Sequence, residues 1–179
     1  MIEIPQFVSE REPGVDEDCV PCSGLMFANA VSGGKYPATL AEAEAMRAQS
    51  GATMGDGDGM NIVQLDAGLK RRYGWSGTIV YSEADVIASL SPGRCMAIIG
   101  RPANCSERSP FRRFLPTFTR LHCVFLANTG SAYWLMDPEG PGDGSYKGQF
   151  VNLTDIRAYY EGDGALVDTI GRLAEDDVE

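Results

Sequence analysis

The sequence contains a single histidine, His122, and is poor in basic residues, with 15 Lys and Arg against 25 Asp and Glu and a formal net charge of -10. Proteins that bind nucleic acid through its phosphates need a basic face, so this balance argues against nucleic acid as a partner. No stretch approaches the roughly 20 apolar residues that span a bilayer, which predicts no membrane span. The first residues lack a basic segment followed by an apolar run, so we expect synthesis in the cytoplasm without a signal peptide.

The five cysteines are Cys19, Cys22, Cys95, Cys105 and Cys123. An odd number, in a chain without a signal peptide, argues against a framework of disulfides. The spacing of Cys19 and Cys22 resembles that of zinc ligands, and His122 with Cys123 would complete such a site. However, a second closely spaced cysteine pair is missing, and neighbouring residues of a strand point to opposite faces. We therefore expect no metal and no other cofactor.

Apolar patterns and turn residues predict helices in the first half of the chain and mostly strands in the second. Predicted helices cover 19–32, 39–50, 62–73, 82–90 and 154–160, and predicted strands cover 2–7, 78–81, 95–99, 120–127, 132–136 and 149–153. This order is typical of an α+β domain, which we place at residues 1–163. Residues 164–179 are predicted to form a C-terminal helix, with Leu166, Ile170 and Leu173 at helical spacing, and an acidic tail.

The first predicted helix carries thiols in its first turn. Asp18 is a suitable N-cap, and Pro21 is tolerated where backbone N–H groups have no intrahelical partner. A helix N-terminus carries partial positive charge, which lowers the pKa of a nearby thiol and favours the nucleophilic thiolate. Buried cysteines also serve as small apolar packing residues, so a catalytic interpretation requires a base elsewhere in the chain.

The only imidazole that can act as this base is His122, at the start of a predicted strand. Nucleophilic cysteine needs a base within hydrogen-bond reach, and the base needs a third group that holds its tautomer. Asp137 ends the next predicted strand, just before Pro138, and the turn at 128–131 predicts a hairpin between the two strands. Adjacent antiparallel strands would place His122 and Asp137 at neighbouring strand ends.

These residues resemble those of papain-like cysteine peptidases, and most of all the bacteriocin-leader-processing peptidases with their phage and bacterial relatives. That family opens its helix with Cys-Gly-Pro-x-Ser followed by Met, where this chain has CVPCSGLM at 19–26. It continues with a strand that begins His-x-Val, a hairpin containing Gly, and a strand that ends Asp-Pro. The matching segments here are HCVFL at 122–126, Gly130 and Asp137-Pro138, and the resemblance spans roughly residues 4–160.

The resemblance implies a papain-like fold, in which an N-terminal helical half packs its cysteine helix on a C-terminal antiparallel sheet. It implies a cysteine hydrolase that cleaves a peptide or isopeptide bond, with a peptidoglycan cross-bridge or a Gly-rich peptide as substrate. Cys19 would be the nucleophile, His122 the general base and acid, and Asp137 the orienting residue. The papain pattern Cys-x-x-Cys would favour Cys22 as the nucleophile instead. That pattern continues with an aromatic residue, however, and this chain has Ser23 at the corresponding position.

Two positions depart from the family pattern. Val20 stands where the family has Gly after the nucleophile. The family also has a Gln upstream whose amide stabilises the oxyanion; Glu10 occupies that place here, and Gln6 is farther upstream than expected. A carboxylate at this position would be an acceptor where a donor is needed, and loss of one donor costs roughly 3 kcal/mol.

A proline-rich insertion at 101–116 carries Arg108, Arg112 and Arg113 in an otherwise acidic protein. Insertions of this length are often functional, so this loop, or the C-terminal helix, is a candidate contact for an acidic protein partner. A solvated loop that balances neighbouring acidic residues explains the charge equally well. The alternative function is therefore a catalytically weak or silent papain-like module within a larger assembly, such as a component of a phage virion.

Overall fold

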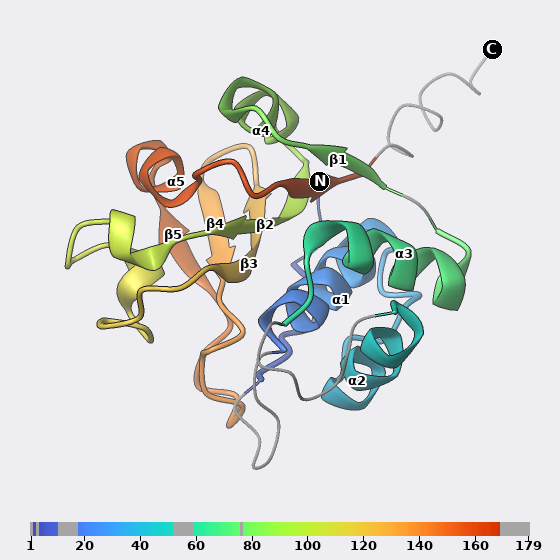
Figure 1. Ribbon diagram of the computed structural model, residues 1–179. Coiled ribbons are helices and arrows are strands. Elements are labelled where there is room, and N and C mark those ends of the chain that lie inside the picture. Colours follow the sequence, from blue (N-terminus) through green and yellow to red (C-terminus); the bar gives the residue numbers. More distant parts are fainter. Residues whose placement is uncertain (1, 3, 11–17, 52–58, 76, 169–179) are drawn as a thin grey trace.

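The computed structural model describes residues 2, 4–10, 18–51, 59–75 and 77–168, and Figure 1 shows its course. Within these ranges the helices are α1 Cys19–Val31, α2 Leu40–Gln49, α3 Ile62–Tyr73, α4 Glu83–Ser89 and α5 Leu153–Tyr159, with short 3-10 helices η1 Pro102–Asn104 and η2 Pro110–Arg112. The strands are β1 Thr78–Val80, β2 Cys95–Gly100, β3 His122–Asn128, β4 Tyr133–Met136, β5 Gln149–Val151 and β6 Ala165–Val167. The predicted α+β class is confirmed. No helix in the described ranges is long and apolar enough to cross a membrane.

The strands form one antiparallel sheet in the order β1-β6-β2-β3-β4-β5. The predicted hairpin is β3 and β4, in which Leu126 pairs with Leu135 and Phe125 with Met136. Because the two strands run in opposite directions, the start of β3 and the end of β4 lie at the same end of the sheet. This arrangement brings His122 and Asp137 close together, as the register of the hairpin predicts.

Helices cover both faces of the sheet, and the side chains of the central strands alternate between them (Figure 1). In β3, Cys123, Phe125 and Ala127 belong to the core that contains α1 and α3, while Val124 and Leu126 belong to the core that contains α4 and α5. This period of two is the pleat of a strand that is buried on both sides. It explains why β3 reads as a continuous apolar run in the sequence.

The helix α1 lies between the sheet and the helices α2 and α3 (Figure 1). Residues from Val20 to Ala30 are all buried. The close approach of α3 requires glycine at position 24, because a Cβ atom there would lie 2.1 Å from the Cδ1 atom of Leu65. Buried helices resist displacement, so α1 gives its first residue, Cys19, a fixed position at the end of the sheet.

Three local predictions need correction. The carboxylate of Asp18 makes no capping hydrogen bond to α1, because it accepts one from Arg47 of α2. Residues 4–9 form no strand; the N–H of Gln6 donates to the side chain of Asn29 instead of joining a ladder. Residues 165–167 form β6 between β1 and β2, where all three are buried, so the domain extends past 163 and no helix begins at 164. The rest of the predicted C-terminal helix, from 169, lies outside the described residues.

Candidate functional site

The structure brings Cys19, His122 and Asp137 together from three different elements. Cys19 is the first residue of α1, His122 is the first of β3, and Asp137 directly follows β4. The Nε2 atom of His122 lies 2.7 Å from the Oδ1 atom of Asp137, and the side chain of His122 is also hydrogen-bonded to that of Cys19. Since Nε2 is engaged by Asp137, Nδ1 is the nitrogen left for the thiol.

Backbone contacts hold both partners of the His122–Asp137 pair. The N–H of Glu139 donates to the Oδ1 atom of Asp137 at 3.0 Å, and the N–H of Asp137 donates to the hydroxyl of Tyr146 at 3.0 Å. The hydroxyl of Tyr159 donates to the backbone carbonyl of His122. These bonds fix where β3 begins and where β4 ends, and therefore fix the orientation of the imidazole.

Burial and charge act in opposite directions on the imidazole and the thiol. Burial lowers the pKa of His122, which is only 3% exposed, but the charge and hydrogen bond of Asp137 and the contact with Cys19 outweigh it and raise the pKa to about 10. Burial raises the pKa of Cys19 above its usual 9.0, while the hydrogen bond and charge of His122 lower it. The net direction is upward, so the prediction that the helix N-terminus would lower this pKa is wrong: desolvation outweighs the other effects.

Glu10 is close enough for its charge to raise the pKa of the same thiol. The residue is 6% exposed, its N–H donates to the carbonyl of Pro138 at 2.9 Å, and its side chain is hydrogen-bonded to that of Glu139. Burial, this bond and the charges of Glu139, Asp137 and Asp18 raise the pKa of Glu10 to about 9. At neutral pH the hydrogen-bonded pair of Glu10 and Glu139 therefore holds a proton, and its raised pKa disfavours a carboxylate at position 10.

Gln6, the other candidate for the oxyanion site, lies elsewhere. Its N–H donates to the side chain of Asn29, ten residues along α1 from Cys19, which is about 15 Å at the rise of a helix. Its side chain is exposed. Of the two upstream candidates, only Glu10 is close enough to influence the pKa of Cys19.

Comparison of the sequence with protein-family models gives no match, and comparison with curated proteins gives none either. The chemistry of the site therefore follows from the arrangement of its own residues.

Among the five cysteines, Cys19 alone is a partly exposed residue, although its thiol is itself desolvated. Cys22 and Cys123 lie in the core beneath it, and burial raises the pKa of each, that of Cys123 to about 12. A reagent or substrate from solvent therefore reaches Cys19 before Cys22. Within the described part of the chain, no group of three His, Cys, Asp or Glu residues is placed to hold a metal ion.

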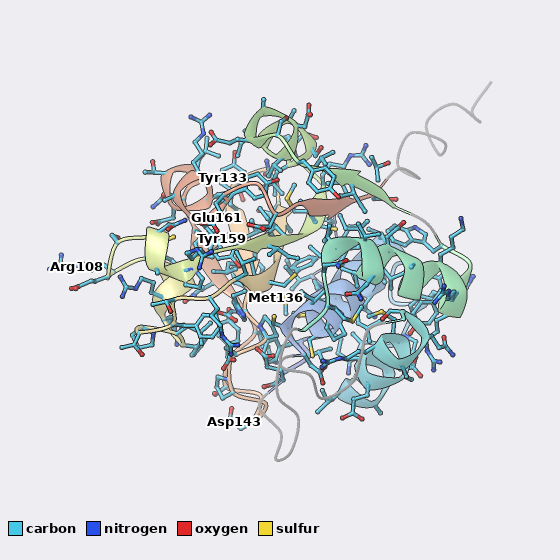
Figure 2. All side chains as sticks on the ribbon, in the orientation of Figure 1. Arg108, Tyr133, Met136, Asp143, Tyr159 and Glu161 are labelled. Atoms are coloured by element: carbon cyan, nitrogen blue, oxygen red, sulfur yellow. The ribbon has the colours of Figure 1, made fainter. Side chains whose placement is uncertain are left out.

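The basic insertion at 101–116 is an ordered loop in which three of its four arginines have internal partners, and one of these is Arg101, which binds Glu161 at 2.7 Å. Arg112 donates to the carbonyls of Cys105 and Pro116, and Arg113 donates to the side chain of Gln149 at 2.8 Å. Arg108 is exposed at the end of the loop, where its side chain extends away from the body of the protein (Figure 2). Arg112 and Arg113 are thus occupied in supporting the loop, and Arg108 is the arginine best placed to meet a partner.

An open cavity of about 410 Å³ lies away from the site, lined by Pro37, Glu42, Gln49, Arg71, Arg72 and Tyr73. Arg72 binds Glu42 through two hydrogen bonds, of 2.6 and 2.7 Å, and the hydroxyl of Tyr73 donates to the same carboxylate. These bonds neutralise Arg72, while Arg71 donates to the backbone carbonyl of Gln49 at 2.7 Å.

Several residues of the site were not predicted from the sequence. They are Glu139, which pairs with Glu10; Tyr146 and Tyr159, which hold the backbone at Asp137 and His122; and Arg47, which pairs with Asp18. Only Glu139 carried a local signal, because it lies two residues beyond Asp137. The others join the site through contacts between residues distant in the sequence.

Proposed function

We propose that this protein is a papain-like cysteine hydrolase in which Cys19 is the nucleophile, His122 the general base and acid, and Asp137 the residue that orients the imidazole. The observation that carries the proposal is the contact of Cys19 with His122, which continues through the 2.7 Å hydrogen bond from His122 to Asp137, at the one cysteine of the five that is partly exposed. This is the geometry that an activated nucleophile requires.

The reaction follows from these contacts. The thiol of Cys19 gives its proton to Nδ1 of His122, and the thiolate remains beside the resulting imidazolium, whose hydrogen bond and charge stabilise it. The sulfur attacks the carbonyl carbon of the substrate, and its oxygen gains negative charge at the N-terminus of α1, where backbone N–H groups of the first turn have no intrahelical partner. The imidazolium gives its proton to the leaving nitrogen as the C–N bond breaks. Neutral His122 then takes a proton from water, which displaces the sulfur.

The protonation state of Glu10 fits this mechanism. A carboxylate beside the developing oxyanion would oppose it, but a group with a pKa raised to about 9 carries no charge at neutral pH. Below about pH 9, Glu10 in place of the Gln of the family pattern therefore adds no negative charge beside the transition state. The substrate class we propose is a peptide or isopeptide bond, with peptidoglycan cross-bridges and Gly-rich peptides as the candidates that the resemblance suggests.

The test is alkylation by iodoacetamide across pH, with the modified peptides identified by mass spectrometry, together with an electrophilic peptide probe. We expect Cys19 to react first and the other four thiols to react slowly. In His122→Ala the pH dependence of the Cys19 reaction should move to higher pH, because the contact that lowers the thiol pKa is gone.

Cys22→Ala is the matched control, because Cys22 lies in the same turn of α1 but is fully buried. It should leave the labelling of Cys19 unchanged. Slow reaction of all five thiols with ordinary alkaline dependence, or labelling of Cys19 that is indifferent to His122→Ala, would contradict the proposal.

A second candidate is an inactive module that serves as a structural or interaction component of a larger assembly, such as a phage virion. The observation that favours it is the burial that raises the pKa of Cys19. For such a module, Cys19→Ala leaves assembly intact, whereas Arg108→Glu, which reverses the exposed charge of the loop, weakens it. Assembly that ignores Arg108→Glu would remove the loop as a contact.

A further inference from the structure

Cys22 has no part in the proposed hydrolysis, yet it lies in the same turn of α1 as Cys19. Both residues belong to the helix, and the N–H of Cys22 donates to the carbonyl of Asp18 at 3.0 Å, so the helical ladder already includes this turn. Residues three apart in an α-helix lie one above the other on the same face, with about 5–6 Å between their Cβ atoms. The two thiols are therefore neighbours through the geometry of the helix itself.

A disulfide between these two cysteines requires only a small movement. Bridged cysteines have Cβ atoms about 3.5–4.5 Å apart, so the gap must close by roughly 1–2 Å. The part that moves is the start of α1, where the side chain of Asp18 makes no capping bond and Pro21 has no N–H to donate. Cys22 is fully buried in the core and stays in place, while Cys19 turns toward it and leaves its contact with His122.

Cys123 is the other thiol in this part of the core, and it is a poorer partner for Cys19. Its strand β3 is paired with β2, where Cys123 lies opposite Ile99, and its carbonyl accepts a hydrogen bond of 3.0 Å from the hydroxyl of Ser23. Movement of Cys123 toward Cys19 would therefore disturb both the sheet and the contact between α1 and β3. Cys95, at the start of β2, lies at the opposite end of the sheet from the site.

We propose that Cys19 and Cys22 form a redox-active dithiol, in which Cys19 attacks small-molecule disulfides of the glutathione type and Cys22 is the resolving thiol. One residue of the pair is partly exposed and the other is fully buried, so the reagent meets Cys19 first and Cys22 reacts only with the sulfur of Cys19. This property does not depend on the hydrolysis of a peptide bond. For the hydrolase proposed above, the disulfide is a reversible off-state, because it consumes the nucleophile.

The reaction consists of two successive thiol–disulfide exchanges. The thiol of Cys19 gives its proton to His122, its sulfur attacks one sulfur of oxidised glutathione, and the departing glutathione thiolate takes the proton from His122. Cys22 then loses its proton, attacks the sulfur of Cys19 and displaces the second glutathione, which takes that proton. The two protein thiols together lose two electrons and two protons, and the reagent is reduced to two molecules of glutathione. Burial raises the pKa of Cys22, so the second exchange is the slower one.

Mass spectrometry distinguishes the alternative products, because trypsin cuts after Arg11 and Lys35 and leaves both cysteines in one peptide. Reduced protein is incubated with oxidised glutathione, quenched in acid, unfolded, blocked with N-ethylmaleimide and digested without reductant. We expect the wild type to give peptide 12–35 two hydrogen atoms lighter and without blocking groups, and to regain both thiols with dithiothreitol. Once excess reagent is removed, Cys22→Ala should keep glutathione on Cys19 at least about tenfold longer than the wild type.

Cys123→Ala and Cys95→Ala are the matched controls and should give the same disulfide as the wild type. Peptide 12–35 joined to peptide 121–147 would make Cys123 the resolving thiol and overturn the proposal. A wild type that stays at the mixed disulfide, or a Cys19 that takes up no glutathione, would also overturn it. These outcomes are read from the wild type, so they remain decisive if Cys22→Ala fails to fold. The iodoacetamide test of the hydrolase uses reduced protein and His122→Ala, so the two proposals fail separately.

Discussion

The substitution Glu10→Gln should change the pH dependence of stability, because Glu10 is the buried acid whose protonation differs most clearly between the folded and unfolded chain. Its pKa rises from 4.5 to about 9 on folding, chiefly through burial. The folded state therefore keeps a proton that the unfolded state releases. The resulting contribution to stability is fully present below about pH 4.5, decreases as the pH rises, and is gone above about pH 9.

The size of the effect follows from these two pKa values. Each pH unit within the window removes about 1.4 kcal/mol from the free energy of unfolding, so the wild type should lose about 4 kcal/mol between about pH 5 and pH 8 on account of Glu10. The pKa of His122 also rises on folding, from 6.5 to about 10, so its contribution to the free energy of unfolding also decreases as the pH rises. This decrease is expected in the wild type and in Glu10→Gln alike. The difference between wild type and Glu10→Gln therefore removes the contribution of His122 and reports on Glu10 together with Glu139, to which its titration is coupled.

The assay is urea denaturation of both proteins at several pH values between 5 and 8.5, followed by tryptophan fluorescence. We expect Glu10→Gln to gain stability relative to the wild type as the pH rises, by about 1 kcal/mol or more per unit. Glu107→Gln, an exposed acid, is the control and should follow the wild type. Parallel curves for wild type and Glu10→Gln would mean that Glu10 is ionised in the folded state, and would refute the reasoning.

Three further substitutions test how the site is held. Arg47→Met leaves the carboxylate of Asp18, 1% exposed, without its cation, and should cost about 3–5 kcal/mol in urea denaturation, most of which the double variant with Asp18→Asn should recover. Tyr159→Phe removes the hydroxyl that donates to the carbonyl of His122 and should cost about 1–3 kcal/mol and slow alkylation of the site thiol. Gly100→Ala would place a Cβ atom 2.4 Å from the carbonyl oxygen of Tyr159, so thermal unfolding should show a loss of at least about 1–3 kcal/mol.

Most of the fold could be predicted because the local signals agree with the tertiary structure. Asn61 forms a capping box with Gln64 at the start of α3, and Gly74 ends that helix in the left-handed conformation. The apolar run of β2 is buried on both faces, and the hairpin register brings His122 to Asp137. Prediction from the sequence failed where a side chain forms its hydrogen bond with a residue distant in the sequence instead of with a neighbouring backbone group. Asp18 has the sequence context of an N-cap, but Arg47, which is 29 residues away, takes its carboxylate.

The pKa values of the site could not be predicted from local sequence, because burial dominates those of the thiols and Glu10, and a tertiary contact with Asp137 decides that of His122. The same desolvation that raises the pKa of Cys19 also raises those of Cys22, Cys123 and Glu10. For the thiol this opposes nucleophilic chemistry, but for Glu10 it favours that chemistry, because the neutral acid removes a negative charge from beside the thiolate and the oxyanion. A thiolate at Cys19 is therefore favoured only while two conditions hold together: His122 keeps its proton through Asp137, and Glu10 keeps its own. The pKa of His122 is raised to about 10 and that of Glu10 to about 9, so both groups are protonated at neutral pH. As the pH rises, Glu10 is the first of the two to lose its proton.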